Sequence, residues 1–105
     1  MTDLIELKST YEQEAPALAM AKALVERKLA ACVHVSGPVI SAFVWDGAPQ
    51  LEPEWMLTAK TRADLFEAAA AAISEAHPYD LPCITATPMT ATAAFRDWVV
   101  RETGG

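Results

Sequence analysis

The sequence predicts an α+β protein with a ferredoxin-like split βαβ sandwich, in which the order strand, helix, strand, strand, helix, strand is followed by a C-terminal helix. Two observations predict this class. A β-branched run over residues 31–45 turns at Asp46 and Gly47 and runs back, which is typical of a long bent hairpin, and helix-spaced apolar residues lie on both sides of it. The 105 residues fit one domain, 1–105, because a domain usually takes about 100–200 residues.

The N-terminal part of the chain predicts a strand and then a helix. The strand is expected over residues 4–7, and Ser9 and Thr10 are expected to begin the descent into a helix over about 13–29. Pro16 fits only the first turn of that helix, because proline lacks the N–H that a helix interior uses. One apolar stripe predicts the face that packs on the core: Leu18, Ala21, Val25 and Leu29.

The hairpin is predicted over residues 31–60. Gly37 and Pro38 interrupt its first strand, because proline cannot donate to the ladder and glycine marks a bulge or bend. The sequence DGAPQ supplies turn residues, and LEPEWMLTAK forms the returning strand. The acidic residues near the hairpin end are interpreted as solvated surface: Asp46, Glu52 and Glu54.

The C-terminal half predicts a helix, a strand and a last helix. Thr61 and Asp64 form a T-x-x-D start, a variant of the capping box, to a helix over about 62–75 whose alanine run predicts a close packing face. The strand CITATPM follows, and Thr92 is expected to cap the last helix. The inward side of that helix is predicted to carry Phe95, Trp98 and Val99.

Charge and cysteine content exclude several classes of partner. Eight basic residues are outnumbered by fourteen acidic ones, whereas a protein that grips phosphate backbones needs clustered Lys and Arg. We therefore expect no nucleic acid and no membrane as a partner. Two cysteines are too few for a disulfide framework, and the start MTDLIELKST lacks the pattern of a signal peptide, so the expected location is the cytoplasm.

Five sequence blocks, in order and spread over nearly the whole chain, resemble the CutA divalent-cation tolerance family. They are ERKLAACV at 26–33, SAFVWDG at 41–47, AKT at 59–61, HPYDLP at 77–82, and a C-terminal helix with a tryptophan. Phe43 replaces the tyrosine of the family's Tyr-x-Trp-x-Gly pattern, which puts any role of that hydroxyl in doubt. The residues that carry the resemblance are Phe43, Trp45, Gly47, Lys60, Pro78, Tyr79, Pro82 and Trp98.

The resemblance implies a tight homotrimer of ferredoxin-like subunits. A physical argument agrees, because a ferredoxin-like sheet has open edges and a long hairpin that reaches past the subunit leaves backbone groups unpaired. Pairing between subunits in a closed ring removes such edges. The number three comes from the resemblance alone.

The resemblance also implies binding of divalent metal ions, copper above all. His77 stands at the position of the family's histidine before the Pro-Tyr step, whereas Ala76 and Ser9 stand where other members carry a second histidine and a cysteine. We expect His77 to be the first ligand of Cu(II) or another divalent metal. One histidine cannot hold a metal tightly, so exchange is expected to be weak or assisted by other donors.

A structural role for the stretch EAHPYDLPCI, residues 75–84, is the alternative. Pro78 and Pro82 fix φ and bias the preceding residues away from helix, so they end the helix and aim the next strand. Tyr79 can bury its ring and use its hydroxyl in a hydrogen bond. His77 would lie at a helix C-terminus, where the dipole favours a protonated imidazole. The residues alone leave both interpretations open.

A second, speculative set of metal ligands consists of Cys32, His34 and Cys83. Cys32 and His34 are two apart on a strand, so their side chains share a face and form half of a soft-metal site that Cys83 can complete. In the ferredoxin-like order the second and fourth strands are opposite edges, so only a neighbouring subunit can unite the set. The alternative is that both cysteines are buried free thiols that act as small hydrophobes.

The function that follows is a CutA-like divalent metal ion (copper) binding and tolerance protein that is trimeric and not an enzyme. No G-x-S-x-G elbow, Gly-rich phosphate loop or H-E-x-x-H pair is present, and an acylphosphatase-like role fails because the chain contains no asparagine. The alternative is a PII-like trimeric signalling module that binds a small ligand or a protein partner at subunit clefts. A third possibility is a scaffold whose trimer is the whole function.

Overall fold

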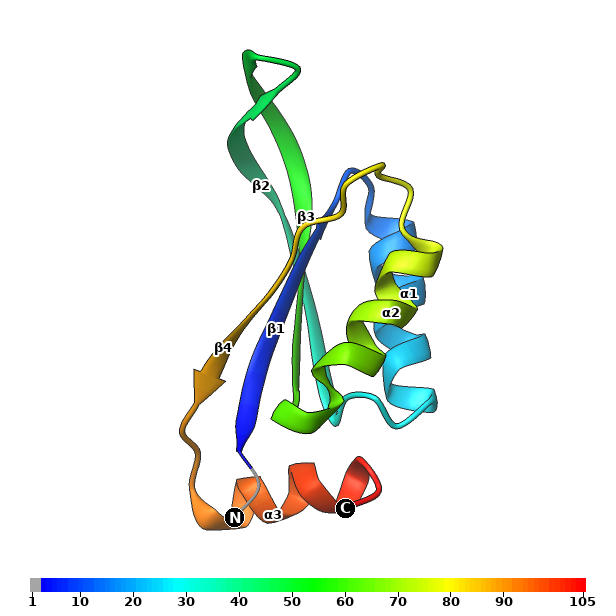
Figure 1. Cartoon of the computed structure of the whole chain (residues 1–105), viewed down its shortest axis with the longest axis vertical. Helices are drawn as coiled ribbons and strands as arrows, with labels where there is room; N and C mark the ends of the chain where they lie inside the picture. Colours follow the sequence, from blue (N-terminus) through cyan, green and yellow to red (C-terminus); the bar gives the residue numbers. More distant parts are fainter. Residues whose placement is uncertain (1–2) are drawn as a thin grey trace.

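The computed structural model describes residues 3–105, so Met1 and Thr2 of the N-terminal segment lie outside the described residues. A four-stranded antiparallel sheet has the order β2-β3-β1-β4, the order of a ferredoxin-like sheet, and this confirms the predicted fold class. Helices α1 and α2 lie side by side on one face of the sheet, and α3 crosses its end opposite the hairpin tip (Figure 1). The elements in chain order are β1 Leu4–Tyr11, α1 Glu14–Glu26, β2 Cys32–Trp45, β3 Ala48–Arg62, the 3₁₀ turn Ala63–Leu65, α2 Phe66–Ala76, β4 Ile84–Met89 and α3 Ala93–Glu102.

The hairpin of β2 and β3 projects far beyond the two helices (Figure 1), in a molecule that measures 44 × 23 × 22 Å. Trp45 pairs with Ala48, so Asp46 and Gly47 form a two-residue turn, and both have positive φ (51° and 76°), as a type I′ turn requires. The ladder shifts register between Ser36 and Val39, which confirms the predicted interruption at Gly37 and Pro38. The interruption bends the ribbon without ending it.

The first strand is longer than the predicted residues 4–7. It continues through Ser9 and Thr10 to Tyr11, because β3 offers a partner along its whole length: Ser9 pairs with Leu57 and Thr10 with Met56. The expectation that Ser9 and Thr10 begin the helix is therefore wrong. The last strand is shorter than predicted, since β4 begins at Ile84 and Cys83 precedes it.

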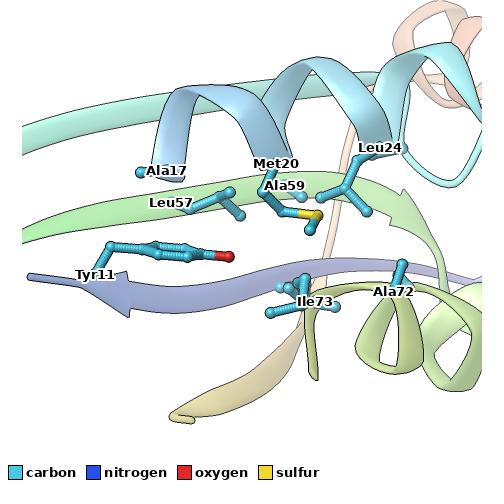
Figure 2. Packing of buried hydrophobic residues seen from close by; sticks show 11 residues of the cluster. Tyr11, Ala17, Met20, Leu24, Leu57, Ala59, Ala72 and Ile73 are labelled. Atoms are coloured by element: carbon cyan, nitrogen blue, oxygen red, sulfur yellow. The ribbon is translucent and has the colours of Figure 1, made fainter. Parts of the chain in front are cut away.

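The predicted face of α1 is only partly right: Ala21 and Leu29 pack against the core as partly buried residues, but the centre of the buried face lies elsewhere. Leu18 and Val25 are 50% and 45% exposed, whereas Ala17, Met20 and Leu24 are buried against Leu57 and the rest of the core. Both sets have the spacing i, i+3, i+7, so periodicity allowed two phases about 100° apart. Figure 2 shows this cluster, with Ala72 and Ile73 of α2 on its other side; the alanines of α2 provide the predicted packing face.

The start of α2 also differs from the prediction. Thr61 is a fully buried residue of β3 opposite Ile5, and its hydroxyl has no hydrogen-bond partner within residues 3–105. The proposed T-x-x-D cap is therefore absent, because the helix begins after a 3₁₀ turn and Asp64 binds Arg62 Nη1 at 3.2 Å instead. In α3, by contrast, Thr92 Oγ1 accepts from the Phe95 N–H at 3.3 Å, as predicted.

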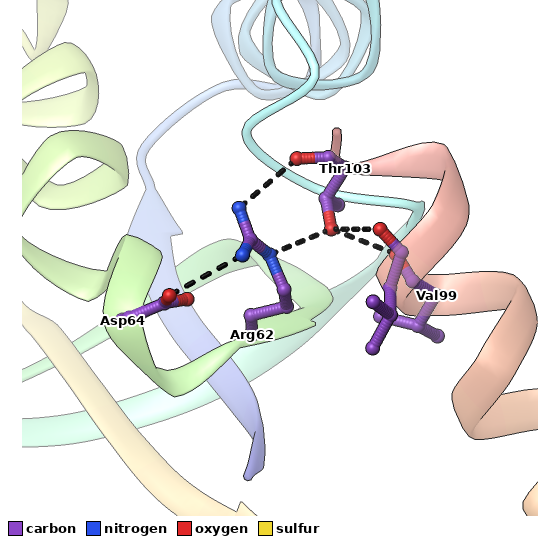
Figure 3. Close-up of polar contacts among 5 residues, drawn as sticks. Arg62, Asp64, Val99 and Thr103 are labelled. Carbon is purple, nitrogen blue, oxygen red and sulfur yellow. Dashed lines mark hydrogen bonds and ion pairs between the residues drawn. The ribbon is translucent and has the colours of Figure 1, made fainter. Parts of the chain in front are cut away.

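Arg62 fastens α3 to the end of β3 (Figure 3). Its Nε donates to Thr103 Oγ1 and its Nη2 donates to the Thr103 carbonyl, both at 3.1 Å. The Thr103 hydroxyl in turn donates to the Val99 carbonyl at 2.8 Å. Val99 is fully buried, and Phe95 and Trp98 are half-buried, so the predicted inward side of α3 is confirmed.

Candidate functional site

His77 is held between β1 and the loop that follows α2. Its Nε2 lies 2.8 Å from the Thr10 carbonyl oxygen, and its Nδ1 lies 3.2 Å from the Tyr79 backbone nitrogen. A carbonyl only accepts and a backbone N–H only donates, so Nε2 carries the proton and Nδ1 accepts. The ring is therefore neutral, and it stacks on Tyr11 with centroids 4.2 Å apart and planes 22° apart.

The environment of His77 lowers its pKa below the usual 6.5. Burial of the ring is the main cause, and it outweighs the Thr10 carbonyl and the charge of Glu54, which both favour the protonated form. The expectation that the end of α2 would favour a protonated imidazole is therefore wrong for this residue. Desolvation prevails because His77 lies against β1 instead of projecting into water beyond the helix.

Tyr79 and Glu54 form the second polar contact of this region. The Tyr79 hydroxyl donates to Glu54 Oε2 at 2.7 Å, so the hydroxyl finds the hydrogen bond that the sequence led us to expect. Burial is the first cause that raises the pKa of Tyr79, and the Glu54 carboxylate adds to it. Glu54 is only 8% exposed, so its assignment to solvated surface is wrong, whereas Glu52 and Asp46 are exposed as predicted.

Sequence reasoning missed Glu54 because strand alternation does not reveal which segment covers an acidic residue. The signal that could have found it lies in Tyr79, whose hydroxyl needs a partner once its ring is buried. The covering segment is the loop 78–83, which lies against β3 at this point.

A groove of about 780 Å³ lies between the hairpin and the loop 78–83. Four carboxylates line it: Glu12 after β1, Glu52 and Glu54 on β3, and Asp80 in the loop. The aromatic residues of its wall are Phe43, Trp45 and Tyr79, and Cys83 also lines it.

The structure does not bring Cys32, His34 and Cys83 together within one subunit. Cys32 pairs with Lys60 and His34 with Thr58, so their side chains share one face of β2, as predicted. Cys83 is exposed and precedes β4, and β3 and β1 separate β4 from β2. Across residues 3–105 no group of three or more His, Cys, Asp or Glu side chains is placed to hold a metal ion.

The remaining residues of the sequence pattern have structural contacts. Lys60 lies 3.7 Å from Glu6 on the sheet, and the ring of Trp98 lies 5.5 Å from that of Phe95. Phe43 and Trp45 are 40% and 45% exposed near the hairpin tip, whose turn contains Gly47. Pro78 and Pro82 lie in the loop between α2 and β4, where no regular element forms.

The sequence matches the family model described as CutA1 divalent ion tolerance protein over residues 6–102, almost the whole chain. The chain belongs to the CutA1 family. A relative from Thermus thermophilus, a divalent-cation tolerance protein CutA, is 34% identical over 96 residues, which cover 90% of this chain and 93% of that one. The resemblance inferred from the five sequence blocks is thereby confirmed.

Solved CutA structures share the whole fold. The divalent ion tolerance protein CutA1 from Ehrlichia chaffeensis superposes with a TM-score of 0.92 at 29% identity, covering 100% of this chain and 99% of that chain. The CutA from Archaeoglobus fulgidus gives 0.89 at 33% identity over 98% and 99% of the two chains. The hairpin and the helix-covered sheet are therefore features of the family.

The comparisons leave the cellular location open and give no support to the signalling alternative. The Archaeoglobus protein is described as periplasmic, and among residues 3–105 no helix combines the length and apolar character that crossing a bilayer requires. The cytoplasmic location stays a prediction. The family match and the relatives named here give no support to a PII-like signalling module.

Proposed function

We propose that this chain is a non-catalytic divalent-metal-binding protein of the CutA1 family, that it acts as a homotrimer, and that copper is its principal ion. Membership of the divalent ion tolerance family over residues 6–102 is the observation that carries the proposal. His77 is the ligand we place first, because it stands before the Pro-Tyr step and its imidazole is close enough to Glu54 to be influenced by that charge.

The hydrogen bonds of His77 are compatible with this role. Histidine ligands of metals usually donate their second ring N–H to a carbonyl or carboxylate, and Nε2 of His77 donates to Thr10 in this way. Nδ1 would be the ligating atom. Its contact with the Tyr79 N–H is the longer of the two, at 3.2 Å, and a metal would displace it.

The donors of one subunit do not complete a metal site. Within the described chain His77 has no two further donors placed around a common point, so a stable complex needs donors from elsewhere. We propose that an adjoining subunit supplies them, with the Cys32–His34 face and Cys83 as the candidate set that only assembly can unite.

Assembly is supported by apolar surface on the hairpin. Ile40, Val44 and Leu51 are 68–70% exposed on a ribbon that extends past the subunit body. Neighbouring exposed apolar residues of this kind mark association sites on soluble proteins. Three copies that pair such ribbons would also cover the open strand edges.

The test is a chelator-competed Cu(II) titration of wild type, His77→Ala and His34→Ala, with the molar mass measured by light scattering in the same samples. His77→Gln is added as a variant that keeps polar atoms near Thr10. We expect trimer mass in all four proteins, and weaker Cu(II) binding in both His77 variants and in His34→Ala. Equal affinity in wild type and both His77 variants removes His77 from the site, and loss in His34→Ala alone moves the site to the Cys32–His34 face.

A further inference from the structure

Helix α1 is more apolar than the core of its own subunit requires. Only Glu14, Lys22 and Glu26 of its 13 residues are charged, although the helix lies on the surface of the subunit (Figure 1). One face packs on the core, while a second apolar stripe, Leu18 and Val25, remains 50% and 45% exposed. A helix that is apolar on more than one side is covered by more than one neighbour. This second stripe, the α1 flank, therefore needs a partner outside the subunit.

The distal part of the hairpin, the ribbon of residues 39–54, has an apolar side. Leu51 is six residues from the buried Leu57 on β3, and an even separation places both side chains on the same side of the strand. Leu57 packs under α1, so this is the helix-covered side of the sheet, and the ribbon extends beyond the helices (Figure 1). Six apolar residues form it in three cross-strand pairs: Ile40 with Pro53, Ala42 with Leu51, and Val44 with Pro49.

The apolar side of the ribbon also lacks a cover within the subunit, since Ile40, Val44 and Leu51 are 68–70% exposed. A helix usually covers an apolar sheet face, as α1 covers the core part of β3. The lengths agree: Leu18 and Val25 are about 10 Å apart along a helix, and Ile40 and Val44 about 13 Å apart along a strand. The α1 flank of one copy can therefore lie along the ribbon of another.

The charges beside the two surfaces are of opposite sign. Residues 39–54 include no Lys or Arg, and the exposed charged residues there are Asp46 and Glu52. Residues 22–28, at the end of α1, carry three basic side chains against one acidic one, and all four are exposed. Opposite potentials steer two surfaces together and fix their orientation.

We propose that the α1 flank of one subunit is the seat of the ribbon of a neighbouring copy of this chain. Two different surfaces of each subunit meet, so the contact is head-to-tail and forms a ring when the rotation between copies closes. This inference rests on the homotrimer proposed above and names two surfaces that join its subunits. It also explains why α1 has two apolar stripes with the same spacing, of which its own core uses one.

The test changes one surface at a time in the full chain. Leu18→Lys/Val25→Lys alters the α1 flank, and Val44→Lys/Leu51→Lys alters the ribbon. All four side chains are 45–70% exposed, so the fold of the subunit does not depend on them. Light scattering gives the molar mass of each protein and of an equimolar mixture of the two variants, and circular dichroism verifies that each is folded.

We expect trimer mass for wild type and monomer mass for each variant alone at the same concentration. The mixture should form a heterodimer, because the intact ribbon of the flank variant fits the intact flank of the ribbon variant, while the ring cannot close. The matched control is Ala71→Lys/Ser74→Lys, which makes the same charge change at exposed positions on α2. It should keep trimer mass.

Trimer mass in the flank variant would overturn the inference, and this is also the result expected if a different protein covers the flank. Two folded monomeric variants that give no heterodimer, or a control that also loses trimer mass, would overturn it as well. A monomeric wild type would instead refute the homotrimer on which the inference rests.

A milder variant decides the matter if the lysine substitutions in α1 prevent folding. Leu18→Ala/Val25→Ala removes the apolar side chains and keeps good helix formers. The concentration at which its trimer dissociates should be at least about tenfold higher than for wild type. Dissociation at the same concentration as wild type would refute the contact.

Discussion

The Tyr79 hydroxyl donates to Glu54 Oε2 at 2.7 Å and thereby joins the loop after α2 to the middle of β3. Two residues earlier, His77 joins the start of the same loop to β1 through Thr10. The stretch HPYDLP is thus anchored to the sheet through the side chains of His77 and Tyr79. A metal role for His77 and this anchoring are compatible, because only the contact from the Tyr79 N–H to Nδ1 would have to be displaced.

Removal of the Tyr79 hydroxyl should destabilise the protein. Tyr79→Phe leaves the buried Glu54 carboxylate without its donor, and hydrogen bonds to charged groups contribute about 1.5–3 kcal/mol. Urea denaturation of wild type and variant at pH 7 measures the change. Tyr11→Phe is the matched control, because the Tyr11 hydroxyl points into the apolar cluster (Figure 2) and has no partner within residues 3–105. That control should be neutral or stabilising by about 1 kcal/mol; a larger loss in Tyr11→Phe than in Tyr79→Phe would contradict the assignment.

Acid should weaken the His77 anchor. The pKa of His77 in the folded protein is below 6.5, so the unfolded chain takes up a proton first as the pH falls. The stability that neutral His77 contributes is therefore complete above pH 6.5 and is lost as the pH falls toward the folded-state pKa. The measurement is the difference in unfolding free energy between wild type and His77→Gln from pH 8 to 5, in EDTA. A difference that grows on acidification would show that folding raises the pKa of His77 instead of lowering it.

High pH should destabilise the protein through the ionisation of Tyr11. Burial raises the pKa of Tyr11 from 10.0 to about 12, so between these values the unfolded state loses the phenolic proton and the folded state keeps it. Stability should fall as the pH rises from 10 toward 12. Tyr11→Phe should show a shallower fall over the same range in denaturation curves, and parallel curves would refute a contribution from Tyr11.

Lys28 should be replaceable by glycine with a gain in stability. The end of α1 is a Schellman motif, in which Leu29 N–H bonds the Leu24 carbonyl and Lys28 has φ of 59°. A left-handed conformation costs a non-glycine residue about 1–2 kcal/mol, partly offset by the flexibility of glycine in the unfolded chain. Lys28→Gly should raise the unfolding free energy by up to about 1 kcal/mol.

The end of α3 offers the reverse experiment. Gly104 has φ of 83° in the same motif and would place a Cβ in open space, so Gly104→Ala tests the backbone conformation alone. It should destabilise by about 1 kcal/mol. Thermal denaturation should show a higher Tm for Lys28→Gly and a lower Tm for Gly104→Ala. A change of Tm in the same direction for both variants would contradict the explanation.

Gly37 should not tolerate a side chain. A Cβ there would lie 2.9 Å from Trp55 Cε3 and 3.0 Å from the Glu54 carbonyl oxygen, and its φ is 152°. Gly37→Ala should therefore cost about 1–3 kcal/mol through overpacking and backbone strain. Gly47→Ala separates the two causes, because its turn has positive φ but no atom within 4 Å. Denaturation curves that coincide for the two variants would mean that contact with Trp55 adds nothing.

The sequence by itself determined the element order, the family and the bent hairpin with its Asp46-Gly47 turn. The element order and the hairpin rest on local properties: proline and glycine restrict the backbone where they stand, and apolar spacing distinguishes strand from helix. The family rests on the resemblance of the five sequence blocks. The sequence also shows directly that His77 precedes the Pro-Tyr step.

The tertiary structure alone decided which face of α1 is buried, how far β1 runs and what surrounds Glu54. Leu18 and Met20 are equally apolar in sequence, and only packing on β3 chose Met20 and Leu24 for the core. The extent of β1 depends on a partner strand some fifty residues later. Glu54 became a buried acceptor because the loop 78–83 folds over it, and no local rule specifies where a distant loop comes to rest.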